Sequence, residues 1–319
     1  MKKMLSAMLA LCMMLTLAAC GKSAETSDDA GSAENAEAVK YYTTAEKPIE
    51  ELVNTEDGST NMMVALDYDS LSAEAQATWD ALKDAGKIVM GVSADYAPFE
   101  FHKDINGKDS IVGFDIYIAT IIANSLGVDL EIVDMSFDNI LMSLDQGAFD
   151  MGYAFIVTEE RLLSADFTDP YYKGDMVLVI RKEDADKYTS LDMFKGLPVA
   201  GQLGAIQETL AKEVSGESTA ILLKSVVNEM LELKSGKVEA VVLDTTTAAG
   251  YVAMHDDLAI CEFVLPYESS GTCVAVQKGD VGMQDLLNSI LDGMTPEEVT
   301  MLMSSAQVLS GFTGELIAE

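Results

Sequence analysis

The residues best suited to chemistry follow a short apolar run near the middle of the chain, where Thr158 and two glutamates precede Arg161. Residues 151–157 are apolar and too few for a helix, so we predict a buried strand. Thr158 is predicted to cap a helix that begins with the glutamates, because carboxylates are stabilised near a helix N-terminus. Arg161 would then lie near the carboxyl end of the strand, where α/β sheets bind ligands, and could grip a carboxylate with two hydrogen bonds. An ion pair with a neighbouring acidic residue on a solvated face is an equally good interpretation of these residues alone.

Strands and helices alternate around this stretch. Apolar runs predict strands at residues 87–92, 130–135, 151–157, 176–181, 198–201, 219–223 and 238–243. Helical spacing of apolar residues predicts helices at 71–85, 115–126, 138–146, 205–214, 226–235, 246–254 and 283–291, with a further helix in the tail. Alternation of this kind indicates βαβ units, an α/β fold and a largely parallel sheet.

The N-terminus has the features of a secretory signal. Lys2 and Lys3 precede an uncharged apolar segment that ends in small residues at Ala19, and the segment is too short to be a comfortable membrane-spanning helix. The tetrapeptide ending at Cys20 resembles a bacterial lipobox, which implies removal of residues 1–19 and acylation of the Cys20 thiol. We therefore expect a lipid-anchored protein on the extracytoplasmic face of the cell membrane. A simple signal with an incidental cysteine is the weaker alternative.

Composition excludes several classes of function. The formal net charge is -33, from 53 acidic and 20 basic residues, which argues against nucleic acid and against an anionic membrane surface as partners. Apart from Cys12 and Cys20, only Cys261 and Cys273 remain, so this is no disulfide scaffold. The two histidines have no further ligands at suitable spacing, so we predict no metal site and no cofactor.

Six motifs in order carry a family resemblance. They are KIVMGVSADYAPFEF (residues 87–101), VGFDIYIATIIANSLGV (112–128), MSFDNILMSLDQGAFDM (135–151), TEER (158–161), DFTDPYY (166–172) and GKVEAVVLD (236–244). Each motif is weak alone, but the ordered set is specific. Over about residues 87–291 the chain resembles the extracellular solute-binding proteins of the polar amino-acid family, which are the receptors of ABC importers.

The resemblance implies a two-lobed periplasmic-binding-protein fold with a two-strand hinge and a ligand cleft between the lobes. Residues 71–171 and 270–319 would form lobe 1 and residues 172–269 lobe 2, with hinges at 171–175 and 267–270. Residues 20–70 would be an acidic tether and a partly docked extension. Cys261 and Cys273 would lie on opposite sides of the second hinge, so we predict no disulfide between them.

The resemblance also implies the ligand contacts. Arg161, in the Thr158-x-x-Arg motif, matches the arginine that binds the α-carboxylate of an amino acid, and Asp244 matches the carboxylate that receives the α-ammonium. Opposite charges facing each other across a closing cleft suit a zwitterion. The alternative for Asp244 is a helix N-cap, a role that is compatible with facing the cleft. Tyr96 and Phe137 match aromatic residues that pack on the ligand, although Phe137 could be a core residue.

Departures from the family pattern concern polarity. Relatives usually place hydroxyl residues before the Thr-x-x-Arg motif and in the second-lobe loop, whereas this chain has an apolar run and the loop of Ala205, Ile206 and Gln207. Tyr153, Tyr96 and Gln207 are the polar groups that could compensate. Ser93 stands where many relatives place an aspartate that reads a basic side chain, which weakens the case for a basic ligand unless Asp95 substitutes. We therefore expect an apolar or aromatic amino acid, or another small carboxylate.

The expected function is capture of this ligand by closure of a monomeric receptor, followed by delivery to an ABC permease with a cytoplasmic ATPase. No catalytic chemistry is required. One alternative is a lipoprotein that senses its ligand and signals to a membrane kinase. An enzyme on the same fold is less well supported, because Asp95 and Glu160 lack a partner for acid–base work.

Overall fold

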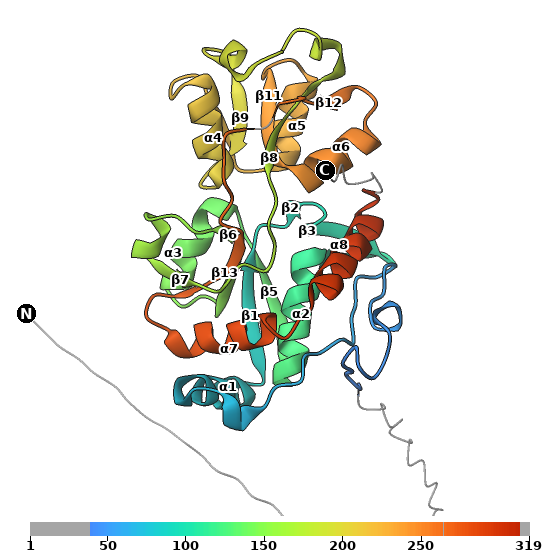
Figure 1. Cartoon of the computed structure of the whole chain (residues 1–319), viewed down its shortest axis with the longest axis vertical. Helices are drawn as coiled ribbons and strands as arrows, with labels where there is room; N and C mark the ends of the chain where they lie inside the picture. The colour runs from blue at the N-terminus through green and yellow to red at the C-terminus, as the bar shows by residue number, and fades with distance from the viewer. Residues whose placement is uncertain (1–38, 264, 313–319) are drawn as a thin grey trace, which may run out of the picture. The chain divides into compact units, whose positions relative to one another are not determined.

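The computed structural model describes residues 39–263 and 265–312 (Figure 1). The predicted signal peptide, Cys20 and the first part of the tether lie outside the described residues. The helices are α1 (Ala73–Ala85), α2 (Phe114–Leu126), α3 (Ile140–Asp145), α4 (Ile206–Ser215), α5 (Val226–Lys234), α6 (Thr245–Met254), α7 (Val281–Leu291) and α8 (Pro296–Ser310). The strands are β1 (Lys87–Val92), β2 (Asp95–Tyr96), β3 (Glu100–Ile105), β4 (Lys108–Val112), β5 (Asp129–Asp134), β6 (Met151–Ile156), β7 (Ala165–Phe167), β8 (Met176–Arg181), β9 (Val199–Gln202), β10 (Ile221–Leu223), β11 (Ala240–Asp244), β12 (Leu258–Ile260) and β13 (Thr272–Gln277).

Two five-stranded sheets organise the structure. The first has the order β5-β1-β6-β13-β7 and the second the order β10-β9-β11-β8-β12, while β2, β3 and β4 form a small third sheet. We call the part built on the first and third sheets lobe 1 and the part built on the second sheet lobe 2. Neither large sheet is largely parallel, contrary to our prediction. Strand β13 runs antiparallel to β6 and β7, and β8 runs antiparallel to β11 and β12.

The chain crosses between the large sheets twice. It leaves the first sheet after β7 and enters the second at β8, and it returns between β12 and β13. The two crossings pair at an isolated antiparallel bridge, where the N–H of Thr272 donates to the carbonyl of Tyr172 at 2.7 Å. The return makes β13 antiparallel to its neighbours, since the chain re-enters the first sheet from the side at which it left.

Helix α2 is buried on almost every side, and this explains its nearly continuous apolar sequence. One side faces the first sheet, and residues 39–70 cover another (Figure 1). The amide of Asn124 donates to the carbonyls of Thr60 at 3.2 Å and Met62 at 2.8 Å, and the Tyr117 hydroxyl donates to the carbonyl of Asn54 at 2.9 Å. These bonds fix the extension on lobe 1.

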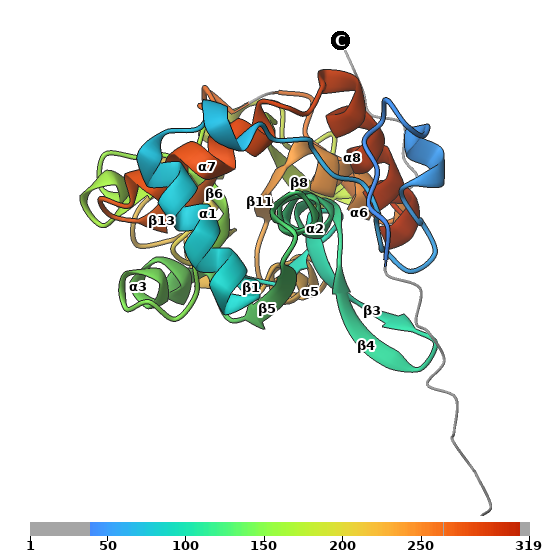
Figure 2. The ribbon, with the colours of Figure 1, turned by 90° about the horizontal axis from the view of Figure 1, so that it is seen from below.

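Helices α1 and α7 lie side by side against lobe 1, as seen from below in Figure 2. Their close approach depends on Gly282, where a Cβ would lie only 2.4 Å from the Thr78 hydroxyl oxygen and 2.7 Å from the Glu74 carbonyl oxygen. The side chain of Ser72 caps the N-terminus of α1, and Gly86 caps its C-terminus. Gly86 has a left-handed φ of 73°, which glycine adopts without strain. Of the described helices, none is both long and apolar enough to cross a membrane.

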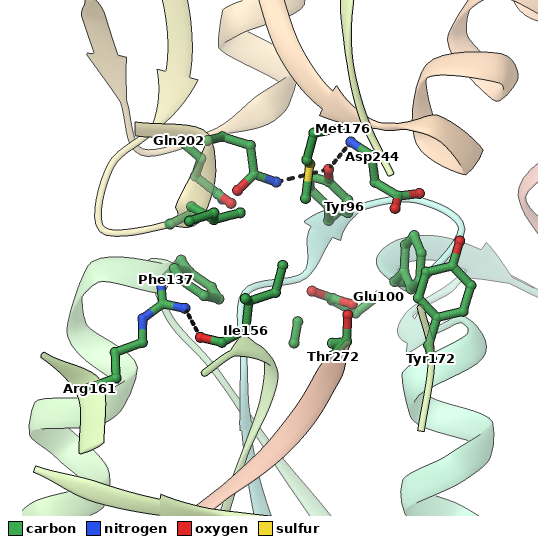
Figure 3. Close-up of a pocket in the computed structure, with 15 residues that line it drawn as sticks. Tyr96, Glu100, Phe137, Ile156, Arg161, Tyr172, Met176, Gln202, Asp244 and Thr272 are labelled. Carbon is green, nitrogen blue, oxygen red and sulfur yellow. Dashed lines mark hydrogen bonds between the residues drawn. The ribbon is translucent and has the colours of Figure 1, made fainter. Parts of the chain in front are cut away.

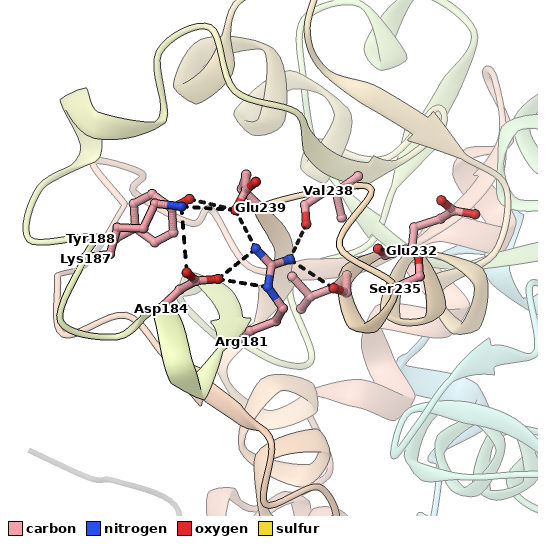
Figure 4. Close-up of polar contacts among 9 residues, drawn as sticks. Arg181, Asp184, Lys187, Tyr188, Glu232, Ser235, Val238 and Glu239 are labelled. Atoms are coloured by element: carbon pink, nitrogen blue, oxygen red, sulfur yellow. Dashed lines mark hydrogen bonds and ion pairs between the residues drawn. The ribbon is translucent and has the colours of Figure 1, made fainter.

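Arg181 forms a cluster of ion pairs and hydrogen bonds at one end of lobe 2 (Figure 4). Its guanidinium pairs with Asp184 and Glu239 and donates to the carbonyls of Leu233 at 3.0 Å and Val238 at 2.7 Å. The side chain is 14% exposed, so these charge-assisted bonds are partly shielded from water. The end of β8 is thereby joined to the segment between α5 and β11.

One local prediction was wrong, and one hairpin was not predicted. Residues 158–164 do not form an α-helix: two turn residues follow Thr158, and a single 3-10 turn covers Arg161–Leu163. The reason is that β7 begins at Ala165 and pairs with β13, which leaves no room for further helical turns. The hairpin of β3 and β4 was not predicted, because its strands are largely polar.

Candidate functional site

A pocket lies where the two lobes meet (Figure 3). Lobe 1 contributes walls from the segment after β1, from β6 and from the turn that follows it, while lobe 2 contributes the β9–α4 loop and the end of β11. The lining residues are Tyr96, Phe99, Glu100, Phe137, Ala154, Ile156, Arg161, Tyr172, Met176, Gln202, Ala205, Ile206, Gln207, Asp244 and Thr272. Most of these side chains are apolar or aromatic, with charged groups at separate points.

Arg161 supplies a half-buried positive charge. The turn after β6 positions it, since the Thr158 hydroxyl accepts from the Arg161 backbone N–H at 3.2 Å. The guanidinium donates to the carbonyl of Ile156 at 2.6 Å and to that of Gly204 in lobe 2 at 2.7 Å, and it lies 5.7 Å from the centre of the Phe137 ring. Among the described residues it forms no salt bridge. Burial lowers the pKa of Arg161 to about 10, which still leaves it charged at neutral pH.

Asp244 supplies a carboxylate at the end of β11. It caps α6, since its side chain accepts from the N–H of Thr246 at 2.8 Å. Only 5% of the residue is exposed, and burial raises its pKa to about 7. The carboxylate lies so close to Gly174 that a Cβ there would be 2.1 Å from Oδ2. The position therefore serves both as an N-cap and as part of the pocket lining.

Tyr96 joins the two lobes. It belongs to β2 of lobe 1, yet its hydroxyl accepts hydrogen bonds from the N–H of Asp244 at 2.9 Å and from the amide of Gln207 at 3.0 Å. Its ring forms part of the pocket wall (Figure 3). Because both donors belong to lobe 2, these bonds exist only while the lobes are together.

Glu100 also lines the pocket, although it was not among the predicted ligand-binding residues. It follows the predicted aromatic wall in the run Tyr96-Ala-Pro-Phe-Glu, and only 2% of it is exposed. Its Oε2 has no hydrogen-bond partner among the described residues. Burial and the neighbouring carboxyl of Asp115 raise the pKa of Glu100 well above its ordinary value. Asp115 in turn accepts from the Tyr171 hydroxyl at 3.0 Å. The signal that was overlooked is a glutamate inside an otherwise apolar motif.

Of the predicted ligand-binding residues, seven line this pocket: Tyr96, Phe137, Arg161, Ala205, Ile206, Gln207 and Asp244. Thr158 instead lines an adjacent groove that also reaches Arg161, Ala205 and Ile206. Whether these side chains hold a ligand stays a prediction. The described residues contain no cluster of three or more histidine, cysteine or acidic side chains suited to a metal ion.

The prediction that Tyr153 lines the ligand pocket is wrong. Tyr153 is fully buried in the core of lobe 1 and packs against the ring of Tyr171 at 5.9 Å between ring centres, so it does not line the pocket. The physical reason is strand alternation: Tyr153 lies on the same face of β6 as Met151, two residues earlier, and this face packs on the α2 side of lobe 1. Ala154, which has a left-handed φ of 67° where the pairing of β6 and β13 shifts register, and Ile156 line the pocket instead.

A family model for bacterial extracellular solute-binding proteins, family 3, matches residues 88–304. The chain belongs to this family. The resemblance predicted from the six motifs is thus confirmed. Solved relatives of this family 3 solute-binding protein are two-lobed periplasmic-binding proteins, in agreement with the predicted fold class. The match begins after α1, so the extension on α2 lies outside it.

Several relatives of this solute-binding protein are named for amino acids. It is 34% identical over 214 residues to the arginine-binding extracellular protein ArtP of Bacillus subtilis, covering 65% of this chain and 80% of that one. It is 32% identical over 172 residues to a probable histidine-binding protein of Campylobacter jejuni, covering 54% and 65% of the two chains. A crystal structure of an amino acid ABC transporter substrate-binding protein of Streptococcus pneumoniae bound to L-arginine matches with a TM-score of 0.68 and 33% identity, covering 72% and 97%.

Proposed function

We propose that this protein binds a free amino acid with a positively charged side chain outside the cytoplasmic membrane and delivers it to an ABC permease. The observation that carries the proposal is the guanidinium of Arg161, which is half-buried yet bonded only to two backbone carbonyls in the described structure. A charge partly withdrawn from water is costly without a counter-charge. The α-carboxylate of an amino acid would supply that charge and could bind through two parallel hydrogen bonds.

Asp244 supports a zwitterionic ligand. In the described form burial raises the pKa of its carboxyl to about 7. The α-ammonium of a bound amino acid would favour the ionised carboxylate. With Arg161 on lobe 1 and Asp244 on lobe 2, one ligand would engage both lobes, and only contacts made better in the closed form can drive closure.

Glu100 supports a cationic ligand side chain. Its free Oε2 lies in the pocket wall, next to the buried carboxyl of Asp115. Burial keeps a proton on Glu100 in the absence of a cation, whereas a guanidinium or ammonium group beside it would stabilise its charged form. The arginine and histidine named in the relatives' descriptions fit this reading.

An apolar or aromatic amino acid is the second candidate. Ile156, Met176 and Phe99 line the pocket, and Ile206 is on the facing loop. These residues offer apolar area but no hydrogen bonds, so an apolar side chain would be bound by burial alone. In that case the carboxyl of Glu100 would stay protonated.

The test is a calorimetric binding screen of the chain without residues 1–20 against each free amino acid, at low ionic strength. We expect binding by arginine or lysine, and a loss of at least about 10-fold in Arg161→Lys, since an ammonium cannot form the paired hydrogen bonds. Tight binding by leucine or phenylalanine instead would select the second candidate. Absence of binding by every amino acid would refute both.

Membrane attachment and delivery complete the proposal. Acylation of Cys20 would hold the receptor at the extracytoplasmic face of the membrane, with the acidic residues before position 39 as a self-repelling tether. Mass spectrometry of the membrane fraction would detect a diacylated or triacylated N-terminal cysteine. A Cys20→Ser variant that stays membrane-bound would contradict this part alone.

A further inference from the structure

Asp95 makes a further connection between the lobes, in addition to those of Arg161 and Tyr96. It lies on β2 of lobe 1, but its carboxylate accepts from the backbone N–H of Val226 at 2.9 Å and from the amide of Gln202 at 3.3 Å, both in lobe 2. Val226 is the first residue of α5. The first N–H groups of a helix lack partners within the helix, and a carboxylate placed there is stabilised by hydrogen bonding and by the helix dipole. Separation of the lobes would return both partners to water.

Glu229 lies one turn further along α5. The residue is 0% exposed, and neither carboxyl oxygen has a partner among the described residues. An ionised carboxylate without partners in such a place is strongly disfavoured, so the group is held neutral. Burial, followed by the charge of Asp95, raises the pKa of Glu229 well above its ordinary value. The proton on Glu229 thus depends in part on a residue from the other lobe.

The other titratable groups around α5 do not neutralise Glu229. Helix α5 packs on β2, β8, β9, β10 and β11. Strand β2 contributes Asp95 and Tyr96. Strand β8 ends at Arg181, whose charge is already paired with Asp184 and Glu239. Strand β11 ends at Asp244, which caps α6. Strands β9 and β10 carry no titratable side chain. Tyr251 of α6 also faces the pair of acids. Among these, no free cation is available to hold a second negative charge.

We propose that closure of the lobes takes up one proton, held by Glu229 beside Asp95, so that acid pH favours the closed form. In the open form Asp95 and Tyr96 would be withdrawn and Glu229 would regain access to water. Its pKa would then fall towards the ordinary value of about 4.3. The closed form therefore binds the proton more tightly than the open form, and by linkage each pH unit of acidification in the window above about 4.3 favours closure by up to about 10-fold.

Asp95 acts here as a positioning residue, since it is not itself a pocket-lining residue and works through its hydrogen bond to α5. The inference goes beyond the proposed function, and it concerns the lobes rather than the ligand. It can therefore be tested on unliganded protein. A result against it would leave the ligand proposal intact, and the converse also holds.

The experiment is small-angle X-ray scattering of the unliganded chain without residues 1–20 between pH 5.5 and 8.0. Because Asp244 is also buried between the lobes and titrates, all variants carry Asp244→Asn. In this background we expect the radius of gyration to fall as the pH is lowered. When Glu229→Gln is added, the radius of gyration should stay near the low value that the background reaches at acid pH, across the whole pH range. Its pH dependence should be reduced or lost. Adding Glu213→Gln, an exposed glutamate on α4, should change nothing.

Asp95→Asn is the second variant and guards against misfolding of Glu229→Gln. It keeps an oxygen for the Val226 N–H but removes the charge that raises the pKa of Glu229, so the transition in radius should move to lower pH. Near-ultraviolet circular dichroism would verify that each variant is folded. A radius independent of pH, or a pH dependence unchanged by Glu229→Gln, would overturn the proposal.

Discussion

The guanidinium of Arg161 in lobe 1 donates a hydrogen bond to the carbonyl of Gly204 in lobe 2 at 2.7 Å. The backbone of Gly204 lies against lobe 1 at this point: a Cβ would be 2.9 Å from the Cα of Asp138. Gly204 also has a left-handed φ of 78°. The Arg161 guanidinium, which is proposed to bind the ligand carboxylate, can therefore form this bond only when the two lobes are in close contact.

Gly204→Ala is expected to weaken ligand binding by about 10-fold or more, because the added methyl would keep the lobes apart before Arg161 reaches the loop. Gly196→Ala is the matched control. It has the same φ of 78°, but a Cβ there meets no atom within 4 Å. Both changes carry a similar backbone strain. Calorimetric titration should show a large loss for Gly204→Ala only, and equal losses in both variants would contradict the contact.

Glu100→Gln is expected to separate the two candidate ligand classes. A glutamine keeps the shape of the side chain but cannot become negative, so binding of arginine or lysine should fall by about 10-fold or more. Binding of an apolar amino acid should be unchanged or slightly tighter. Glu131→Gln on the exposed edge of lobe 1 is the control. Unaltered binding of a cationic ligand to Glu100→Gln would exclude Glu100 as its partner.

Asp244 should make ligand affinity depend on pH. Its pKa in the unliganded closed form is about 7, and an α-ammonium would lower it, so binding releases a proton. Affinity should therefore be retained above about pH 7 and lost progressively as the pH falls below that value, by up to about 10-fold per unit. This trend is opposite to the one proposed for Glu229. Titrations in buffers of different ionisation enthalpy would count the protons, and Asp244→Asn should remove the release.

Gly250 and Phe312 are expected to show strong coupling. The Phe312 ring packs on Gly250 of α6 so closely that a Cβ there would overlap it, and it lies 5.4 Å from the Tyr251 ring between centres. Phe312→Ala should lower the free energy of unfolding by about 3 kcal/mol. Gly250→Ala should destabilise the natural chain, although alanine favours a helix by about 1 kcal/mol over glycine.

The double variant provides the control for this pair. In the Phe312→Ala background the overlap is gone, so Gly250→Ala should become stabilising by about 0.5 to 1 kcal/mol. Urea unfolding followed by circular dichroism would measure all four proteins. The same effect of Gly250→Ala in both backgrounds would show that Phe312 does not pack on α6 in solution.

Local sequence was sufficient for most helices and for the strands next to them. Helix α1 illustrates this: Ser72 and Gly86, which mark its ends, are recognisable as cap residues, and its apolar residues repeat with helical spacing. The turn of β3 and β4 was also readable in principle, since Asn106-Gly107 is a typical hairpin pair and both residues have positive φ. It was missed because the flanking strands lack apolar alternation.

Local motifs were enough to identify the chemical groups of the site, whereas its geometry depends on contacts between distant parts of the chain. The motifs around Arg161, Tyr96 and Asp244 identified side chains that the fold brings to one pocket, because each follows or ends a predictable element. Tyr153 and Glu100 could not be assigned in this way. Tyr153 is buried because α2, which is distant in sequence, covers the face of β6 that carries it, and the burial of Glu100 likewise depends on packing by residues distant in sequence. Which face of a strand is covered and the pKa of a buried carboxyl are both set by such long-range contacts, which no local pattern encodes.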